Sequence, residues 1–261
     1  MEFTGKLGKY KIIETEDQTK TVWSEYFNEA CHNLVGAYAE TIYNYILGCS
    51  IPDQLTSDKD VHVFDVGFGI GVGLTALIDE AKKQTLAENK KITYTSIELD
   101  EDLFLWSVQT NFPNENFKKI ENYYTAEIKI SSHIAINARI FIGDGRLTVP
   151  QAAQSGRLPK FTAIFQDAFS PGRNPALWTV EWFGNLKEIS DPEVYMSTYS
   201  SSVSIRKSMI VSGWIIENAK GFGAKRTMTK ARLHGEISPA LAAELSRSPA
   251  LELRDNSAKI E

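Results

Sequence analysis

The feature of this sequence that points most directly to chemistry is a short apolar strand that runs into closely spaced glycines. Residues 61–73 read VHVFDVGFGIGVG, with Gly67, Gly69, Gly71 and Gly73 at alternate positions. Glycine lets the backbone turn tightly and approach a ligand with no Cβ in the way, and the helix that follows offers unpaired N–H groups to polar ligand atoms. The segment therefore predicts a nucleotide-binding turn.

The spacing of these glycines narrows the class of ligand. GxGxG preceded by Asp65 differs from the GxGxxG pattern of dinucleotide-binding proteins. It resembles the first motif of methyltransferases that use S-adenosyl-L-methionine (AdoMet), a ligand without a pyrophosphate. The alternative is a glycine-rich turn with no ligand, which the acidic residues at later strand ends argue against.

Two acidic residues follow later strands at positions suited to hold a nucleoside. Glu98 ends the apolar run of residues 92–99, where a carboxylate can accept hydrogen bonds from both ribose hydroxyls. Asp144, within the sequence GDG, is predicted to accept a hydrogen bond from the adenine amino group. Asp100 and Glu101 are close enough to leave the choice of ribose anchor open, and Glu98 is preferred because it directly follows the apolar run.

A further strand ends in QDAFSPGRNPALW, which contains the candidate catalytic residue, Asp167. Methyl transfer from a sulfonium needs mainly in-line positioning of an acceptor lone pair, so proximity and orientation supply most of the rate. An alkyl amine resembles the lysine head, with a pKa of about 10, and must be neutral before it reacts. A carboxylate that accepts its N–H and orients its lone pair meets that need. The alternative role for Asp167 is a turn cap before Ser170.

Aromatic and basic residues supply candidate contacts to a nucleic-acid substrate. Aromatic rings near the site can stack on a flipped base, and a basic region in the last third of the chain can contact RNA phosphates. The candidates are Tyr26, Phe27, Phe169, Trp178 and Tyr199 for stacking, and Arg206, Lys225 and Arg226 for the phosphates. Core packing and a solvated charged face are the alternative roles of these residues.

The composition of the chain argues against a general nucleic-acid coat protein, a metal-binding protein and a membrane protein. The 261 residues are 43% hydrophobic, which is enough for a substantial core, and the formal charge of −5 argues against a general nucleic-acid coat. Neither the two cysteines nor the four histidines have metal-ligand spacing, so no metal is predicted. No apolar run approaches the ~20 residues that cross a bilayer, and the first 20 residues lack an apolar signal region. A cytoplasmic protein without membrane contact is therefore expected.

The candidate residues can form one site only in a fold that brings the ends of several strands together. The sequence alternates predicted strands with predicted helices, which is typical of such a fold. We predict strands that begin near residue 61 and at 92–99, 138–145, 161–169 and 194–200, followed by a pair of strands after residue 213. The predicted helices are 72–83, 102–111, 175–189 and 203–211. Residues 114–137 fit either an inserted helix or a hairpin. The expected class is α/β, with a Rossmann-like, mostly parallel, seven-stranded sheet.

The two ends of the chain are expected to lie outside this sheet. Apolar spacing over residues 23–47 predicts one long or two short amphipathic helices, and residues 51–59 read as a loop. The predicted organisation is a helical N-terminal extension over residues 1–60, the main domain over 61–235, and a tail over 236–261 with a short helix.

Several motifs together resemble the methyltransferase part of MnmC, a family of tRNA wobble-uridine modification enzymes and their stand-alone relatives. The motifs are FDVGFGIGVGLTAL, SIELD, IGDGR, QDAFSPGRNPALWT, TYSSSVSIRKSMIVSGW and GFGAKRTMTKA, within roughly residues 24–232. The resemblance implies a class I methyltransferase fold with AdoMet as the donor. It also implies a tRNA substrate, with 5-aminomethyl-uridine, usually 2-thiolated, at the wobble position of the anticodon loop, and the 5-methylaminomethyl form as product.

The same resemblance assigns roles to individual residues. It places Asp167 next to the accepting amine. It implies that the AdoMet site includes Asp65, Gly67, Gly69, Gly71, Glu98 and Asp144, with Glu40 helping to close it. The chain has neither the length nor a second glycine-rich motif for the flavin-dependent domain of bifunctional members, so no FAD is expected and other enzymes must supply the aminomethyl group.

Three other functions compete with this reading. A spermidine synthase-like aminopropyltransferase shares the sheet and the GDG element, but it binds a dicationic polyamine, whereas QDAFSPGRNP has one acid and Arg173. A small-molecule amine methyltransferase would keep AdoMet without RNA, and the basic region argues mildly against it. A catalytically silent RNA-binding protein is least expected, because Asp167 accompanies the full cofactor set.

Overall fold

The computed structural model describes residues 1–224 and 226–255, and the centre of this part is a mixed sheet of nine strands. Their order is β12-β13-β11-β10-β5-β6-β9-β8-β7. The strands are β5 (Val61–Val66), β6 (Ile92–Glu98), β7 (Lys118–Ile120), β8 (Tyr123–Lys129), β9 (Ala135–Ile142), β10 (Phe161–Phe165), β11 (Ser190–Thr198), β12 (Ile215–Lys220) and β13 (Thr227–Arg232). The strands from β11 to β9 in this order pair in parallel, and the outer ones pair antiparallel.

All seven predicted strands are present in this sheet. Strands β7 and β8 are additional, and they form a hairpin that extends the edge beyond β9. Residues 114–137 therefore contribute a hairpin rather than an inserted helix.

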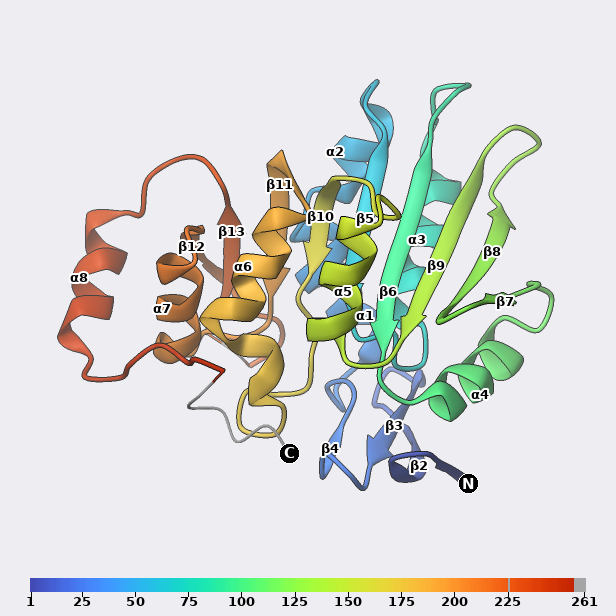
Figure 1. The fold of residues 1–261 in the computed structure, drawn as a ribbon, viewed down its shortest axis with the longest axis horizontal. Helices are drawn as coiled ribbons and strands as arrows, with labels where there is room; N and C mark the ends of the chain where they lie inside the picture. Colours follow the sequence, from blue (N-terminus) through green and yellow to red (C-terminus); the bar gives the residue numbers. More distant parts are fainter. Residues whose placement is uncertain (225, 256–261) are drawn as a thin grey trace.

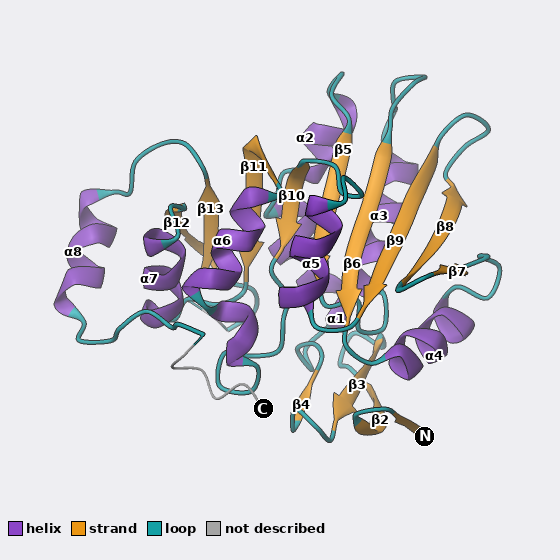
Figure 2. Cartoon of the chain, viewed as in Figure 1, coloured by secondary structure: helices purple, strands orange, loops and turns teal. Residues whose placement is uncertain are grey.

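Helices cover both faces of the sheet, as Figure 2 shows with α3 on one face and α5 and α6 on the other. They are α1 (Ala37–Thr41), the π-helix η1 (Ile42–Leu47), α2 (Ile51–Thr56), α3 (Val72–Lys83), α4 (Glu101–Asn111), α5 (Gly145–Gln154), the 3-10 helix η2 (Pro175–Trp178), α6 (Val180–Glu188), α7 (Val203–Val211) and α8 (Pro239–Arg247). The predicted helix over 175–189 is divided into η2 and α6, and α5 was not predicted.

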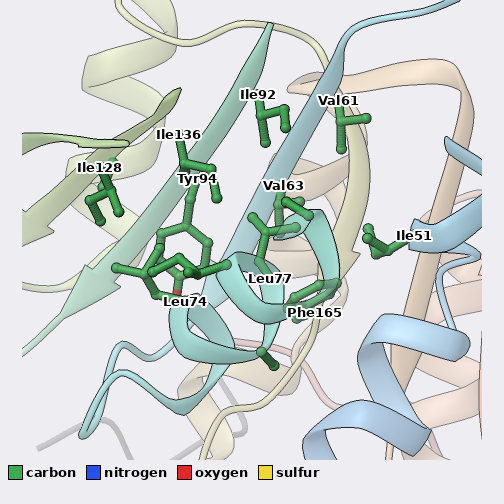
Figure 3. Packing of buried hydrophobic residues seen from close by; sticks show 14 of the residues in the cluster. Ile51, Val61, Val63, Leu74, Leu77, Ile92, Tyr94, Ile128, Ile136 and Phe165 are labelled. Carbon is green, nitrogen blue, oxygen red and sulfur yellow. The ribbon is translucent and has the colours of Figure 1, made fainter. Parts of the chain in front are cut away.

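The central strand β5 shows why these strands read as continuous apolar runs. Val61 and Val63 lie in the hydrophobic cluster shared with α2 and α3, which Figure 3 shows around Leu74 and Leu77. Phe64 lies in the opposite cluster, with Trp182 of α6. Successive side chains of a strand point to opposite faces, so a strand covered on both sides is apolar at nearly every position.

The first 30 residues contradict the predicted helical extension. They form a four-stranded antiparallel sheet of β1 (Glu2–Gly5), β2 (Gly8–Glu14), β3 (Lys20–Ser24) and β4 (Glu29–Ala30). Figure 1 shows this N-terminal sheet below the main sheet, next to the ends of β6 and β9. Of the predicted 23–47 helical layer only α1 and η1 are helical, and the predicted 51–59 loop contains α2.

Tertiary packing explains the N-terminal strands. Tyr10 and Val22 are buried against Ile70 and Leu103, which belong to the main domain. Phe3 stacks on the Trp106 ring of α4, with ring centroids 4.4 Å apart. A strand followed by a short helix produced the three- and four-residue apolar spacing that suggested one continuous helical layer.

The C-terminal tail contains the predicted short helix, α8, and then returns to the main domain. Lys207 Nζ donates to the carbonyl oxygens of Ser248 at 2.9 Å and Ala250 at 2.7 Å. The N–H of Val180, at the start of α6, donates to Leu253 O at 2.9 Å. In the described residues, no helix has the length and apolar character needed to span a membrane.

Lys90 closes the end of α2, and its loss is expected to destabilise the fold. Its buried ammonium donates to the carbonyl oxygens of Gln54 and Ser57, both at 2.7 Å, and to that of Lys59. Lys90→Met leaves three carbonyls without this donor, so we expect the free energy of unfolding in urea to fall by about 1–3 kcal/mol. The exposed neighbour provides the control, Lys91→Met, which should change it by less than about 0.5 kcal/mol. Equal midpoints and slopes for both variants would contradict this role of Lys90.

Candidate functional site

A cavity of about 680 Å³ lies at the carboxyl ends of the central parallel strands. Its walls include Gly67 and Gly69 after β5, Glu98 at the end of β6, Asp144 after β9 and Asp167 after β10. Carboxyl ends of neighbouring parallel strands meet at one edge of a sheet, so residues far apart in sequence share one site. The structure therefore brings together five of the residues singled out from the sequence.

The glycine turn contributes two different properties to this wall. Gly67 and Gly69 line the cavity with φ of 98° and 54°, a backbone region that other residues rarely adopt. A Cβ on Gly69 would have no heavy atom within 4 Å, and one on Gly67 only Asp167 O, at 3.8 Å. Their missing side chains therefore leave room in the cavity itself.

Gly71 and Gly73 instead permit close packing behind the turn. A Cβ on Gly71 would lie 2.5 Å from the Phe112 ring, and one on Gly73 would lie 2.1 Å from Asp65 Oδ2. Neither Gly71 nor Asp65 lines the cavity. Asp65 is buried and accepts a hydrogen bond from Tyr94 Oη at 2.5 Å, and burial raises its pKa to about 7. Gly71 and Asp65 therefore support the turn from behind, and their part in the AdoMet site stays a prediction.

Glu98 faces the cavity and also holds the glycine turn. Its Oε2 accepts from the N–H of Gly69 at 2.9 Å, and its Oε1 accepts from the N–H of Asp100 at 3.0 Å. Burial raises the pKa of Glu98 to about 7, although the hydrogen bonds from the backbone of Asp100 and Gly69 act to lower it. A carboxylate next to the turn is placed to accept hydrogen bonds from a nucleoside.

The neighbouring acids that left the ribose anchor open have other partners. Asp100 caps the N-terminus of α4, where it accepts from the N–H groups of Asp102 and Leu103. Glu101 accepts from Lys119 Nζ at 2.5 Å and from Lys6 Nζ at 2.6 Å. Neither acid lines the cavity, so the structure favours Glu98 among the three.

Asp144 lines the cavity and caps α5. It accepts from the N–H of Arg146 at 2.9 Å and pairs with the Arg146 guanidinium at 2.5 Å. Burial works against ionisation of Asp144, but the hydrogen bonds from Arg146 hold its pKa below the usual value. Arg146, in IGDGR, also lines the cavity, so it joins the site although its position in the sequence predicted no role for it.

Asp167 follows β10, beside the glycine turn that follows β5, and it lines the same cavity as two aromatic rings. Tyr45 Oη donates to Asp167 Oδ1 at 2.5 Å. Phe27 and Phe169 line the cavity and stack on each other, with ring centroids 4.2 Å apart and an interplanar angle of 23°. Tyr26 lies edge-on to Phe27 and is half exposed. In such a cavity the rings can stack on an aromatic base, and the carboxylate can bind an amine that the base carries.

The N-terminal sheet and its connections contribute a wall of the cavity that no sequence motif marks. Leu7, between β1 and β2, lines the cavity, and so do Cys31 and His32, which follow β4. Helices were expected in this part of the chain. Burial lowers the pKa of His32 to about 4 and raises the pKa of the Cys31 thiol, so both are uncharged near pH 7. Glu29 Oε2 accepts from the N–H of Ser170 at 2.9 Å, which joins β4 to the loop after Asp167. No sequence motif marked Leu7, because tertiary packing alone brings it to the site.

Asp100 anchors this N-terminal sheet, and its loss is expected to weaken both the fold and the cofactor site. It is fully buried and accepts from the N–H of Leu7 at 2.9 Å, the N–H of Lys6 at 3.1 Å and Tyr10 Oη at 3.0 Å. Asp100→Asn places an amide donor among these donors. We expect the free energy of unfolding to fall by about 2–3 kcal/mol and cleavage of residues 1–32 by protease to accelerate.

The matched control is Asp102→Asn, which changes the next carboxylate along α4. It should leave the protease pattern near wild type and alter stability by less than about 1 kcal/mol. If Asp100→Asn keeps wild-type protection of the first 32 residues, the anchoring role of Asp100 is wrong.

Several predicted site residues do not line the cavity. Glu40 is buried and accepts from the N–H of Asn33 at 3.0 Å, next to the cavity-lining Cys31 and His32. Trp178 is buried in the core, where its Nε1 donates to Phe169 O at 2.8 Å. Tyr199 Oη donates to Ala168 O at 2.9 Å. Stacking on a base is therefore corrected to support of the walls for Trp178 and Tyr199, and the role of Glu40 in closing the AdoMet site stays a prediction.

The basic residues predicted to contact phosphates differ in how exposed their side chains are. Arg206 is 2% exposed and donates from Nε to Thr229 Oγ1 at 3.0 Å, so the prediction of a surface phosphate contact is wrong for it. Its charge marked it as a surface residue, but it lies under α8, with Glu244 Oε1 3.7 Å from its guanidinium. Arg226 is exposed, and Lys225 lies outside the described residues.

The cavity fits AdoMet in size and in donor set. Small-ligand sites usually enclose 300–1,000 Å³ and are mostly apolar with a few placed polar groups. Here the apolar part includes Phe68, Ile97 and Leu103, and the polar part includes Glu98 and the backbone at Gly69. The open space at the missing Cβ of Gly69 allows a ligand to approach the backbone directly.

Comparisons with known proteins agree with this geometry. Residues 108–234 match a family model described as S-adenosyl-L-methionine-dependent methyltransferase. The chain is 25% identical over 236 residues to a Methanocaldococcus jannaschii protein, covering 88% of this chain and 62% of that protein. It is 26% identical over 234 residues to the bifunctional MnmC protein of Paraburkholderia phymatum, covering 81% of this chain and 33% of that protein. The chain thus spans about a third of the length of such bifunctional relatives.

A solved structure shows the same fold over nearly the whole chain. MnmC2 of Aquifex aeolicus superposes with a TM-score of 0.76 at 24% identity, covering 97% of this chain and 81% of that one. The matches together confirm the predicted resemblance to the MnmC methyltransferase part, the class I fold, and a methyltransferase enzyme with AdoMet as its donor.

Proposed function

We propose that this chain methylates the exocyclic amine of 5-aminomethyl-(2-thio)uridine at the wobble position of tRNA, giving the 5-methylaminomethyl form. The MnmC relatives are described as tRNA 5-methylaminomethyl-2-thiouridine biosynthesis bifunctional proteins, which supports this substrate class. The observation that carries the proposal is that Asp167 lines the same cavity as the stacked rings of Phe27 and Phe169. The proposed substrate makes the cytoplasm the expected compartment.

The chain's own residues provide position and a proton acceptor. AdoMet, when bound, supplies an electrophilic methyl group on a sulfonium. Glu98 and the backbone of Gly67 and Gly69 hold the nucleoside part, and the N-terminal sheet excludes water. Asp167 accepts a proton from the substrate ammonium and orients the nitrogen lone pair. Bound AdoMet would then give its methyl group to this nitrogen, the electron pair of the broken S–C bond would stay on sulfur, and a secondary ammonium would result.

The RNA is held outside the donor pocket in this proposal. Tyr26, which is half exposed at the cavity, stacks with Phe27 and Phe169 on the bases around the wobble position. Arg226 and Lys225 contact phosphates of the anticodon loop, which gives a net acidic protein a local basic face. Arg173 lines the cavity and repels a free polyamine, which favours a base-linked amine over a dicationic acceptor.

The test is transfer of labelled methyl from AdoMet to tRNA isolated from cells arrested at the aminomethyl stage. Putrescine and the free 5-aminomethyluridine nucleoside serve as parallel acceptors. Label in the wobble nucleoside supports the proposal. Label only in a small amine, or none in tRNA despite tight AdoMet binding, rejects the RNA substrate.

A further inference from the structure

A buried tyrosine contacts the candidate catalytic carboxylate from the far side of the cavity wall. Tyr45 Oη donates to Asp167 Oδ1 at 2.5 Å, although the two residues are 122 positions apart in sequence. Tyr45 is 2% exposed and does not line the cavity, so its hydroxyl reaches the acceptor site only through Asp167.

The backbone around Tyr45 holds this hydroxyl in place. Tyr45 lies on η1, a π-helix, and such segments occur frequently at functional sites. Ser197 Oγ of β11 donates to Asn44 O at 2.5 Å, which joins η1 to the sheet. A Cβ on Gly48 would lie 2.5 Å from Ser197 Oγ, so glycine permits this close approach. The Tyr45 ring also packs on Phe165 of β10, the strand that leads to Asp167, with centroids 5.5 Å apart.

We propose that Tyr45 is a positioning residue for amine methylation, which orients the Asp167 carboxylate toward the ammonium group of the substrate. This inference rests on the proposed function. A hydrogen bond to one oxygen limits rotation of the carboxylate about its Cβ–Cγ bond, so the other oxygen keeps a fixed direction toward the substrate amine. The hydroxyl also favours the ionised carboxylate, the form that accepts the proton.

The titratable groups around Tyr45 keep its hydroxyl protonated over the working pH range. Burial and the Asp167 carboxylate raise the pKa of Tyr45 well above its usual range, so the hydroxyl keeps its proton. The other titratable groups near this pair in the described residues are Glu29 of β4, Cys31 just after β4, Glu40 of α1, Tyr94 of β6 and Tyr199 just after β11.

The experiment compares Tyr45→Phe with a matched control, Tyr38→Phe. Both variants remove only a hydroxyl that donates to an aspartate, since Tyr38 Oη donates to Asp79 Oδ2 at 2.8 Å, away from the cavity. We expect Tyr45→Phe to lower kcat on aminomethyl tRNA about 10–100-fold, with the Kd of AdoMet within about two-fold of wild type. In Tyr45→Phe the fall of kcat on the acidic side of the pH profile should begin at a higher pH than in wild type. Tyr38→Phe should retain the wild-type kcat, Kd and pH profile.

A double-mutant cycle separates positioning from a general structural effect. In an Asp167→Asn background, Tyr45→Phe should change kcat by less than about two-fold, because the carboxylate it orients is gone. Rates are normalised to the sites that bind AdoMet, so partial unfolding does not imitate the effect. Equal kcat and an unmoved pH profile for Tyr45→Phe, or the same loss in both backgrounds, overturn the role of Tyr45. Absence of transfer to tRNA by the wild type instead overturns the proposed function.

Discussion

Replacing Asp167 by asparagine is expected to lower the rate of methyl transfer about 10²–10⁴-fold while leaving AdoMet affinity within about two-fold of wild type. Asparagine keeps the size of the side chain and can still accept from Tyr45, but it takes no proton from an alkyl ammonium. Single-turnover transfer of labelled methyl at saturating AdoMet measures the chemical step, and calorimetry measures cofactor binding.

The residual rate of Asp167→Asn carries a second signature. Without a proton acceptor in the site, the amine must lose its proton to solvent, so the rate should rise with pH toward the amine pKa of about 10. The control is Asp53→Asn, which changes an exposed acid on α2. A wild-type rate and pH profile for Asp167→Asn would show that another group accepts the proton.

Replacing Glu98 by glutamine is expected to weaken AdoMet binding about 10–100-fold, with a smaller change in kcat at saturating donor. In the proposed binding mode a charged acceptor of two ribose hydroxyls becomes a neutral amide, and the contact with the Gly69 N–H weakens as well. Because burial raises the pKa of Glu98 to about 7, wild-type affinity should decline as the pH falls below 7. Glu98→Gln should lose this component of the pH dependence, and calorimetric titrations from pH 5.5 to 8.5 would show it.

Stability without the cofactor should change in the opposite sense. With a folded pKa of about 7 against the ordinary 4.5, the folded state binds a proton at Glu98 that the unfolded state releases. Glu98 therefore adds to the free energy of unfolding as the pH falls from about 7 to about 4.5, and it destabilises the fold above 7. The difference between wild type and Glu98→Gln in urea unfolding isolates this contribution. A difference that does not vary with pH would show that Glu98 stays ionised in the fold.

Local sequence predicted the parts of the site that a single strand and turn determine. Helix 72–83 was predicted from its apolar spacing and found as α3, and Gly67, Gly69, Glu98 and Asp167 all reach the cavity. The division of the glycines into two roles could not be predicted from the sequence. The Phe112 ring leaves no room for a Cβ on Gly71, and Asp65 leaves none on Gly73, and only the folded chain brings these neighbours together.

The missed elements depend on contacts between distant segments. The N-terminal strands pack on Leu103 and Trp106 of α4, and helical spacing across residues 23–47 concealed β4. Helix α5 contains Pro150 in its interior, a residue that normally argues against a helix. Arg206 looked like a surface charge because charged residues are rarely buried, and α8 covers it.

The N-terminal sheet has a consequence for the order in which this chain folds as it is synthesised. Its first turn depends on Asp100, 93 residues beyond Leu7. Isolated hairpins are marginally stable, and contacts that close long loops form slowly. The first strands therefore emerge from the ribosome well before the helix that supports them, and they remain open to chaperones and proteases in the interval. The cavity gains its last strand-end carboxylate only when Asp167 has been made, so the ability to bind a ligand should arise late in translation.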